Sequence, residues 1–470
     1  MAIPYIYLRT HNSALDTGNL KLRTLIRDLR IMKVLVVGKG GREHALVWKL
    51  AQSPRAERVF CAPGNAGTAE DGVNVPIEAN DFDRLVSFVR KEKIDLTVVG
   101  PEEPLSLGIV DRFQKLGLRI FGPTKTAAQL ESSKVFAKSL MRHADVPTAD
   151  FRIFDHPEHA RRYIGTRDYP LVVKADGLAA GKGVLVCSTN EEALAAIERV
   201  MVREEFGLAA GRQVVVEKRL EGEELSILAL VSGRIIVPLQ PTQDHKAAFD
   251  GDTGPNTGGM GAYCPAPLGT TELLDAIDRD ILVPTVHAMK RRRQPFRGVL
   301  YAGVMTTNQG PRVLEYNCRF GDPETQPLLV RLRTDLLDLL EAVVDERLDT
   351  FEGKLEWDER PAVCVVMASG GYPGNHAKGL PIYGLAEAAK LPDVKVFHAG
   401  TVREGDRVLT DGGRVLGVTA LGDTLADAQR RAYEAVALIQ FRDAHYRRDI
   451  ADKALRPLAP PSEKAPATVE

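Results

Sequence analysis

Short apolar strands alternate with helical segments at the start of the folded chain, and this alternation constrains the fold most. Residues 33–38 (KVLVVG) form a continuous apolar strand, and helix-like sequence follows from residue 44 to residue 52. The alternation continues to a short strand at residues 119–121. Strands separated by helical patterns predict βαβ units on a parallel sheet. We therefore predict an α/β domain over residues 32–133.

The sequence changes character twice further along the chain. From about residue 134, glycine-rich turns join strands with few crossover helices, which is typical of α+β structure. From about residue 357, short strands broken by Gly, Pro and Asp precede a helix. A chain of 470 residues is also too long for one core. We predict an α+β region over residues 134–350, with a subdomain at about 150–222, and a small β-rich domain over 355–455.

The two ends of the chain carry little pattern. Residues 1–31 are basic, precede a second methionine, Met32, and lack the apolar core of a secretion signal. We interpret them as a non-native or disordered extension. Residues 457–470 (PLAPPSEKAPATVE) are rich in Pro, Ala and charge, so we predict a disordered tail.

Charge and cysteine content exclude several classes of protein. Lys and Arg total 62 and Asp and Glu total 63, so the net charge of -1 offers no general attraction for nucleic acid. No apolar run reaches the roughly 20 residues that span a bilayer, so we expect no membrane partner. The five cysteines lie far apart with no CxxC pair, which predicts reduced, mostly buried thiols, a cytoplasmic location and no thiol-bound metal.

The turn after the first strand resembles a dinucleotide-binding fingerprint but departs from it. Glu43 stands where that fingerprint needs a glycine, and no acidic residue ends the second strand to hold a ribose. NAD binding is therefore disfavoured. What remains is a glycine-rich turn, Gly38 to Gly41, at a helix N-terminus, which is able to hold an anion such as a sugar phosphate. A purely structural tight turn is the alternative.

A second glycine-rich segment, residues 177–183 (GLAAGKG), resembles a phosphate-binding loop without being one. Asp176 occupies the position of its first glycine, and Gly183 replaces the Ser or Thr that would bind Mg²⁺. Strands enter and leave it, so it joins two strands of a hairpin. We predict a lid that folds backbone N–H groups over phosphates, with Lys174 and Lys182 as nearby positive charges. The alternative is a flexible surface hairpin.

Three further segments support a nucleotide site. The first, residues 217–224, is predicted to begin as a linker whose backbone reads an adenine edge and to end in carboxylates that accept ribose hydroxyls. Next, Glu315 and Asn317 alternate on one strand, so they share a face and offer oxygen ligands for Mg²⁺ or Mn²⁺. Residues 250–261 hold five glycines, which let backbone N–H groups approach a ligand. Solvated faces and a disordered linker are the alternatives.

In this order, the motifs GKGGREHAL, PGNAGTA, VGPEEPL, SSKVFAK, VVKADGLAAGKGV, DHK, GPNTGGMGAY and EYNCRFGDPETQ resemble the phosphoribosylamine–glycine ligases (glycinamide ribonucleotide synthetases) of the ATP-grasp superfamily. The likeness runs from Met32 to about Leu455. It implies a Rossmann-like N-terminal domain of the pre-ATP-grasp type, central ATP-grasp domains that close on the nucleotide, and a small C-terminal domain that completes the cleft. One departure is Ala247, where many members carry arginine; it puts one basic contact near the site in doubt.

The resemblance also implies roles for individual residues. It assigns the ATP phosphates, the lid, the adenine linker and the ribose to Lys134, Lys174, Gly181, Lys182, Gly183, Glu217, Leu220 and Glu224. It assigns the metal to Glu315 and Asn317. The phosphoribosylamine side falls to Gly40, Gly41, Arg42, Glu43, Asn65, Glu102, Pro104 and Asn256. The catalytic centre falls to Lys174, Arg319 and Asp244.

The chemistry that the resemblance implies is ATP-driven amide formation in purine biosynthesis. Glycine carboxylate attacks the γ-phosphate of ATP, giving glycyl phosphate and ADP, and the amine of 5-phosphoribosylamine then displaces phosphate. Neither step needs a covalent enzyme nucleophile, so catalysis rests on positioning and charge neutralisation. The expected cofactors are ATP and Mg²⁺ or Mn²⁺, the expected partners are the two substrates, and the expected state is a monomer. A different ATP-grasp carboxylate–amine ligase and a non-catalytic ATP-binding sensor remain as alternatives.

Overall fold

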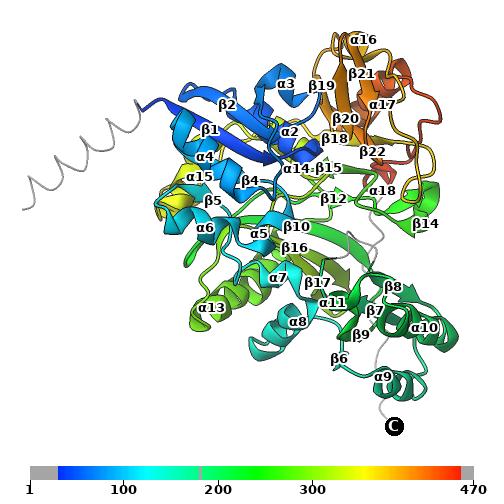
Figure 1. Ribbon diagram of the computed structural model, residues 1–470. Coiled ribbons are helices and arrows are strands. Elements are labelled where there is room, and N and C mark those ends of the chain that lie inside the picture. The colour runs from blue at the N-terminus through cyan, green and yellow to red at the C-terminus, as the bar shows by residue number, and fades with distance from the viewer. Residues whose placement is uncertain (1–29, 179–182, 457–470) are drawn as a thin grey trace, which may run out of the picture.

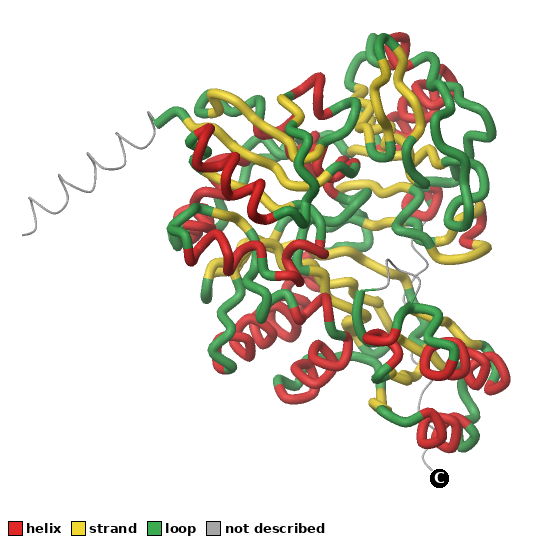
Figure 2. Tube along the Cα trace, in the orientation of Figure 1, coloured by secondary structure: helices red, strands yellow, loops and turns green. Residues whose placement is uncertain are grey.

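The computed structural model describes residues 30–178 and 183–456 (Figures 1 and 2). The predicted C-terminal tail and all but the last two residues of the predicted N-terminal extension lie outside this part of the chain. No helix in the described ranges has the length and apolar character that crossing a membrane requires. All five cysteines lie in the described part and are buried and unpaired, as their spacing predicts.

The N-terminal region folds around a five-stranded parallel sheet of order β3-β2-β1-β4-β5. Its elements are β1 (Met32–Gly38), α2 (Gly41–Leu50), β2 (Ala56–Pro63), α3 (Thr68–Asp71), β3 (Val73–Asn74), α4 (Phe82–Glu92), β4 (Leu96–Val99), α5 (Glu102–Leu107), α6 (Ile109–Lys115) and β5 (Ile120–Phe121). Strand β1 is apolar from Val34 to Val37 because alternate side chains enter different cores: Val34 and Val36 pack with α2, and Leu35 and Val37 pack with α4 and α6. The predicted parallel α/β fold is confirmed. Since the strand order reverses at β1, the turn at its carboxyl end opens into the crevice where such sheets bind ligands.

The central region holds two antiparallel sheets. One has the strand order β6-β9-β7-β8, and its strands are β6 (Phe151–Phe154), β7 (Leu171–Ala175), β8 (Val184–Cys187) and β9 (Val214–Lys218). The helices between these strands in the chain are α9 (Pro157–Ile164), α10 (Asn190–Ile197), η1 (Glu198–Val202) and α11 (Leu208–Gly211). The other has the strand order β11-β10-β16-β17, and its strands are β10 (Glu223–Ser232), β11 (Ile235–Pro238), β16 (Arg297–Thr307) and β17 (Gly310–Asn317). The helices of this region are α7 (Gln129–Ser132), α8 (Lys134–His143), α12 (Thr271–Ile277), η3 (Asp278–Leu282), α13 (Val283–Arg291), α14 (Thr325–Arg331), α15 (Leu336–Val344) and η4 (Leu348–Phe351). Strands β7 and β8 pair antiparallel, so the glycine-rich segment between them joins a hairpin as predicted.

The fourth large sheet, of order β12-β15-β18-β22-β19, combines central and C-terminal strands. Its strands are β12 (Gln243–Asp244), β15 (Gly261–Cys264), β18 (Ala362–Ala368), β19 (Val394–His398) and β22 (Arg414–Leu421), and around it lie β13 (Ala247–Phe249), η2 (Asp250–Asp252), β14 (Thr253–Asn256), α16 (Leu385–Ala388), β20 (Thr401–Glu404), β21 (Arg407–Thr410), α17 (Leu425–Leu438) and α18 (Asp452–Leu455). Strand β15 begins at the end of the segment 250–261, called the glycine-rich loop below, and pairs with β18. The loop is therefore anchored to the C-terminal region by a sheet.

The hydrophobic cores show which parts are joined. One core combines the face of β1 that packs on α2 with α14 and α15, and another combines β10 and β16 with β18, β22 and α17. The sheet β6-β9-β7-β8 carries the predicted lid hairpin and is called the lid sheet below. It packs on its own helices in a separate core whose members all lie between residues 154 and 216. Figure 1 shows this subdomain at the lower right, beside the rest of the molecule. A separate core of this kind lets the lid sheet move as a unit.

Candidate active site

Two lysines and one glutamate form a buried cluster where α8 packs against the lid sheet. Glu217 on β9 forms an ion pair with the Lys138 ammonium at 2.5 Å and another with Lys174 of β7. Lys174 Nζ donates in addition to the Leu314 carbonyl at 3.0 Å. Burial alone would raise the pKa of Glu217, but the two lysines together lower it. Burial lowers the pKa of Lys138 to about 8. The cluster thus holds two positive charges against one negative charge, at the position predicted for the ATP phosphates.

Glu217 differs from its predicted position in a linker. The strand β9 continues to Lys218, because Glu217 pairs on one side with Phe151 of β6 and on the other with Val172 of β7. Its side chain, not an open backbone, is what it offers the site. The connection to β10 begins at Arg219, and Leu220 lies within it. Lys138, which the sequence analysis missed, lies four residues after Lys134 and so shares its helix face.

Lys134 is the first residue of α8, and the end of β7 fixes it there. Ser133 caps the helix by accepting the Phe136 N–H, and its hydroxyl donates to Asp176 at 3.0 Å. Asp176 also accepts the Val135 N–H at 3.1 Å. A carboxylate at a helix N-terminus is stabilised by the free N–H groups and the helix dipole. Asp176, another residue missed in the sequence, therefore ties Lys134 to the strand that carries Lys174.

The predicted metal ligands lie on β17. Burial alone would raise the pKa of Glu315, but Lys134, Lys246, Lys174 and Arg319 lower it to about 2. Asn317 accepts a hydrogen bond from Arg319 at 3.3 Å through its side-chain oxygen. An ionised carboxylate and an oriented amide oxygen form a hard donor set that fits a divalent cation. The described residues contain no group of three or more His, Cys, Asp or Glu side chains suited to a metal.

Lys246, in the DHK motif, is paired with the residue predicted to bind ribose. Its ammonium contacts Glu224 of β10. Burial would lower the pKa of Lys246, but Glu224, Asp244 and Glu315 raise it above its usual range. Lys246 is therefore a fixed positive charge between the nucleotide side and the metal ligands.

Arg319 connects the metal ligands to the N-terminal domain. Its guanidinium pairs with Glu131 at 3.0 Å and with Glu102 at 3.3 Å. Burial would raise the pKa of Glu102, but Arg319 and Arg42 lower it to about 2. Glu131, which the sequence analysis did not select, is buried and also accepts the Cys318 N–H at 2.7 Å. The nearby Pro104 is buried in α5.

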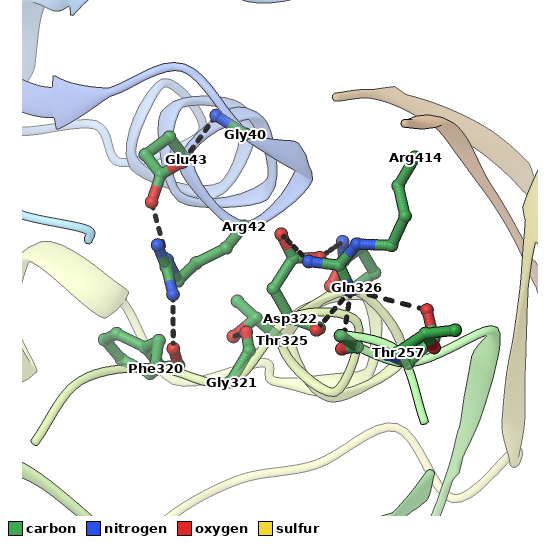
Figure 3. A network of polar contacts seen from close by, with 12 residues as sticks. Gly40, Arg42, Glu43, Thr257, Phe320, Gly321, Asp322, Thr325, Gln326 and Arg414 are labelled. Atoms are coloured by element: carbon green, nitrogen blue, oxygen red, sulfur yellow. Dashed lines mark hydrogen bonds and ion pairs between the residues drawn. The ribbon is translucent and has the colours of Figure 1, made fainter. Parts of the chain in front are cut away.

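The glycine-rich turn is organised by Glu43 (Figure 3). One carboxylate oxygen accepts the Gly40 N–H at 2.5 Å, and the other accepts Arg42 Nε at 2.5 Å. Arg42 also donates to the Phe320 carbonyl at 3.1 Å. A Cβ at Gly41 would lie 2.7 Å from the amide nitrogen of Gln326, so a side chain there would force Gln326 to shift. Glu43 thus shapes the turn, and both its oxygens are already in use.

Arg414, from the C-terminal region, contacts the glycine-rich loop and Asp322 at the junction of the N-terminal, central and C-terminal regions (Figure 3). It donates to the backbone carbonyls of Gly258 at 2.7 Å and Asp322 at 2.6 Å, and it pairs with the Asp322 carboxylate at 3.2 Å. Burial opposes ionisation of Asp322, but Arg414 and Arg42 lower its pKa. One guanidinium therefore joins the glycine-rich loop, the RFGDPE motif and the C-terminal sheet. The sequence analysis did not identify it.

A cavity of about 580 Å³ lies between the N-terminal and C-terminal regions beside this junction. Its lining includes Lys39, Gly40 and Asn65 from one region, segments 399–403 and 411–414 from the other, and Asp322. Asn65 borders the cavity with its side chain fully engaged: it donates to the Lys39 and His398 carbonyls and accepts the Gly67 and Thr68 N–H groups. The structure thus brings the predicted anion-binding turn to a cavity large enough for a sugar phosphate.

Asp244 and Asn256 flank the glycine-rich loop. Asp244 on β12 is 7% exposed, and within the described residues its carboxylate has no hydrogen-bond or ion-pair partner. Burial raises its pKa well above the usual range, against the opposing effect of Lys246. A Cβ on Gly259 would lie 3.5 Å from Asp244 Oδ2 and 2.4 Å from Pro323, so the loop passes close by. Asn256, at the end of β14, is exposed. Of the predicted lid residues, Gly183 is buried, while Gly181 and Lys182 lie outside the described residues.

Comparison with protein-family models decides the affiliation. Residues 32–131, 132–325 and 362–453 match the N domain, the ATP-grasp (A) domain and the C domain of phosphoribosylglycinamide synthetase. The chain belongs to the phosphoribosylglycinamide synthetase family. The family and the ATP-grasp fold predicted from the sequence are confirmed.

Individual relatives of this family agree. The chain is 56% identical to the phosphoribosylamine–glycine ligase of Rhodopirellula baltica, over 90% of this chain and 98% of the relative, and 54% identical to that of Allochromatium vinosum, over 90% and 99%. The crystal structure of the Thermotoga maritima ligase is 35% identical and aligns with a TM-score of 0.78 over 89% of this chain and 100% of that one. The biotin carboxylase domain of 2-oxoglutarate carboxylase from Hydrogenobacter thermophilus aligns with a TM-score of 0.69 over 89% and 92% at 16% identity, which shows the shared fold. The predicted enzyme class, a carbon–nitrogen ligase, is confirmed.

Proposed function

We propose that this chain joins glycine to 5-phosphoribosylamine at the expense of ATP, giving glycinamide ribonucleotide, ADP and phosphate. The observation that carries the proposal is the position of Glu315. Cations from α8, from β7, from the DHK motif and from the RFGDPE motif all act on this half-buried carboxylate. Such a concentration of opposite charges suits the transfer of a phosphoryl group, where charge must be neutralised along the reaction.

ATP and a divalent cation, Mg²⁺ or Mn²⁺, are the proposed cofactors. Glu315 and Asn317 would hold the cation, which supplies charge neutralisation on the phosphates when bound. Lys134 and Lys174 would contact the phosphates, and Lys182 with Gly181 and Gly183 would cover them from the lid hairpin. Leu220, in the connection after β9, would read the adenine through its backbone. Glu224 would accept the ribose hydroxyls at the Lys246 pair.

Glycine would lie between Arg319 and Asp244. Its carboxylate would face the γ-phosphate and attack it, forming glycyl phosphate as ADP leaves. Its ammonium would contact Asp244, because that nearly buried carboxylate has no partner among the described residues and a cation would offset the cost of its burial. The lid must exclude water at this stage, since water would hydrolyse the acyl phosphate.

The sugar phosphate of 5-phosphoribosylamine would occupy the cavity between the N-terminal and C-terminal regions. The turn at Gly40 and Gly41 begins α2, so free N–H groups and the positive end of the helix dipole face an anion there. Glu43, Arg42, Asn65 and Glu102 would shape the turn and the cavity through the contacts described above. The amine would then attack the glycyl carbonyl, the C–N bond would form, and phosphate would leave. The amine gives up one proton in this step, and the departing phosphate takes it up.

Detection of the product tests the proposal. Purified protein is incubated with ATP, Mg²⁺, glycine and freshly generated 5-phosphoribosylamine, and glycinamide ribonucleotide is measured by mass spectrometry, with a control that lacks glycine. Product in the complete mixture alone supports the ligase. ATP binding without turnover would favour a sensor, and turnover only with another acid would favour a different ATP-grasp ligase.

A further inference from the structure

His44 lies on α2, behind the cavity, at the boundary between the N-terminal and C-terminal regions. Its side chain is fully buried, and its ring packs edge-on against Phe397 at 5.5 Å between ring centroids. None of the site contacts described above involves it. It belongs to the GREHAL segment, whose other polar members organise the glycine-rich turn.

The hydrogen bonds of His44 define its protonation. Its Nδ1 accepts the backbone N–H of His398 at 2.7 Å, so its proton lies on Nε2, 2.9 Å from Asp71 Oδ2. Burial lowers the pKa of His44, against the opposing effect of Asp71. Neutral histidine with Nδ1 as acceptor is therefore the form that fits both partners.

The peptide of His398 is held at both ends by the N-terminal region. His44 accepts its N–H, and Asn65 Nδ2 donates to its carbonyl at 2.8 Å. The next five residues, 399–403, form a wall of the cavity. Two polar side chains thus fix the strand end from which that wall starts.

The surrounding contacts leave this peptide little freedom. Lys395 of β19 donates to Asp71 at 2.7 Å, which ties the same strand to α3 a second time. Gly67 lies against both rings, since a Cβ there would come within 2.2 Å of His44 and 2.7 Å of His398. Gly67, the second glycine of the PGNAGTA segment, is therefore needed for the close approach of the two histidines.

We propose that His44 is a positioning residue for 5-phosphoribosylamine: it holds the His398 peptide and thereby sets the wall 399–403 against the glycine-rich turn. The inference rests on the proposed function, because it takes the cavity as the sugar-phosphate site. It predicts that a change at His44 alters the affinity for 5-phosphoribosylamine and leaves the affinities for ATP and glycine nearly unchanged.

Two substitutions of similar size separate this role from general packing. In His44→Asn, the amide oxygen stands near the position of Nδ1 and again accepts the His398 N–H. In His44→Gln, the amide reaches the position of Nε2, contacts Asp71 and leaves that N–H without an acceptor. Glu434→Gln is the control, since it removes an exposed ion pair with Arg430 on α17, and neither residue lines the cavity.

The measurements are KM for each substrate and the Kd of ribose 5-phosphate by calorimetry, a binding probe that needs no turnover. We expect His44→Gln to raise KM for 5-phosphoribosylamine and the Kd of ribose 5-phosphate about tenfold, with KM for ATP and glycine within twofold, and His44→Asn and Glu434→Gln to stay near wild type. Equal behaviour of the Asn and Gln variants, or equal changes for all three substrates, would overturn the inference. Absence of product from the wild-type protein would instead overturn the proposed function.

Discussion

The two halves of the candidate site are built differently. On the nucleotide side, charged side chains from α8, β7, β9 and β17 pair with one another in a short stretch of space, and all of them belong to the ATP-grasp domain. On the sugar-phosphate side, the cavity is lined by turns from regions more than 300 residues apart, and Arg414 ties the C-terminal wall to Gly258 and Asp322 largely through their backbone carbonyls. The first half concentrates charge, whereas the second fixes shape. Removing a side chain should therefore affect turnover in the first half and affinity in the second.

The largest effect is expected for Glu315→Ala. The substitution removes the carboxylate on which the surrounding cations act, so we expect turnover to fall about 1,000-fold or more. The rate of product formation measures this, and circular dichroism and thermal melting check that the fold is intact. Glu315→Gln, which keeps the shape and loses the charge, should be nearly as inactive. A near-normal rate in either variant would contradict the metal assignment.

Arg414→Ala should affect affinity for one substrate. Loss of the guanidinium removes its hydrogen bonds to the glycine-rich loop and its ion pair with Asp322, while β15 stays paired with β18, so we expect KM for 5-phosphoribosylamine to rise about 100-fold. KM for ATP should change little. Arg414→Lys should not restore affinity, because an ammonium lacks the planar fork that reaches the carbonyls and the carboxylate together. Equal losses for ATP and 5-phosphoribosylamine would remove the distinction between the two halves.

Asp244→Asn tests the boundary between them. Asparagine keeps the shape but loses the charge proposed to hold the ammonium of glycine, so we expect KM for glycine to rise about 30-fold, in line with a charge-assisted hydrogen bond of about 2 kcal/mol. Steady-state kinetics at saturating ATP measure this. Serine residues far from the site, such as Ser87 on α4, provide a neutral control as Ser87→Ala. An unchanged KM for glycine would assign the ammonium to another group.

The smallest effect concerns stability, at His245. Both ring nitrogens are buried without a hydrogen-bond partner among the described residues, and burial together with Arg447 and Lys453 lowers the pKa of this histidine to about 4. Below its unfolded pKa of about 6.5, the unfolded chain binds a proton that the folded chain rejects, so the residue destabilises the fold as pH falls. His245→Phe should remove this term. Relative to wild type, we expect a gain of about 1 kcal/mol in unfolding free energy at pH 5.5 compared with pH 7.

Denaturant unfolding at the two pH values measures that difference. Comparing the same variant at both values cancels the constant effect of replacing one ring by another. His44 and His398, whose pKa values burial also lowers, remain in both proteins and cancel as well. An identical pH dependence for wild type and variant would show that His245 does not titrate in this range.

The sequence predicted the parts of the molecule whose signals are local. The parallel sheet, the hairpin and the strand that carries Glu315 each follow from periodicity over a few residues. The lysines Lys134 and Lys174 came from motifs of the same length. Lys138 was within reach of the same reasoning, since it is four residues from Lys134 on one helix.

The missed residues depend on contacts between distant segments. Arg414 lies in an ordinary strand, and its backbone partners are 156 and 92 residues earlier in the chain. Glu131 and Asp176 act as buried partners of Arg319 and of the N-terminus of α8, which no spacing in their own segments indicates. The bonds of both Glu43 oxygens within the turn also come from its folded geometry, and the predicted place of Glu43 on the substrate side stays a prediction. Such roles depend on packing, which a single sequence does not encode locally.

The pairing of β15 with β18 has a consequence for folding during translation on the ribosome. Strand β15 ends at Cys264 and its partner β18 begins at Ala362, so about a hundred residues must be synthesised before the two can pair. At 5–20 residues per second, β15 remains an open sheet edge for roughly 5–20 seconds. The glycine-rich loop before it gains its anchor only after that interval. The nascent chain therefore completes its catalytic centre near the end of translation.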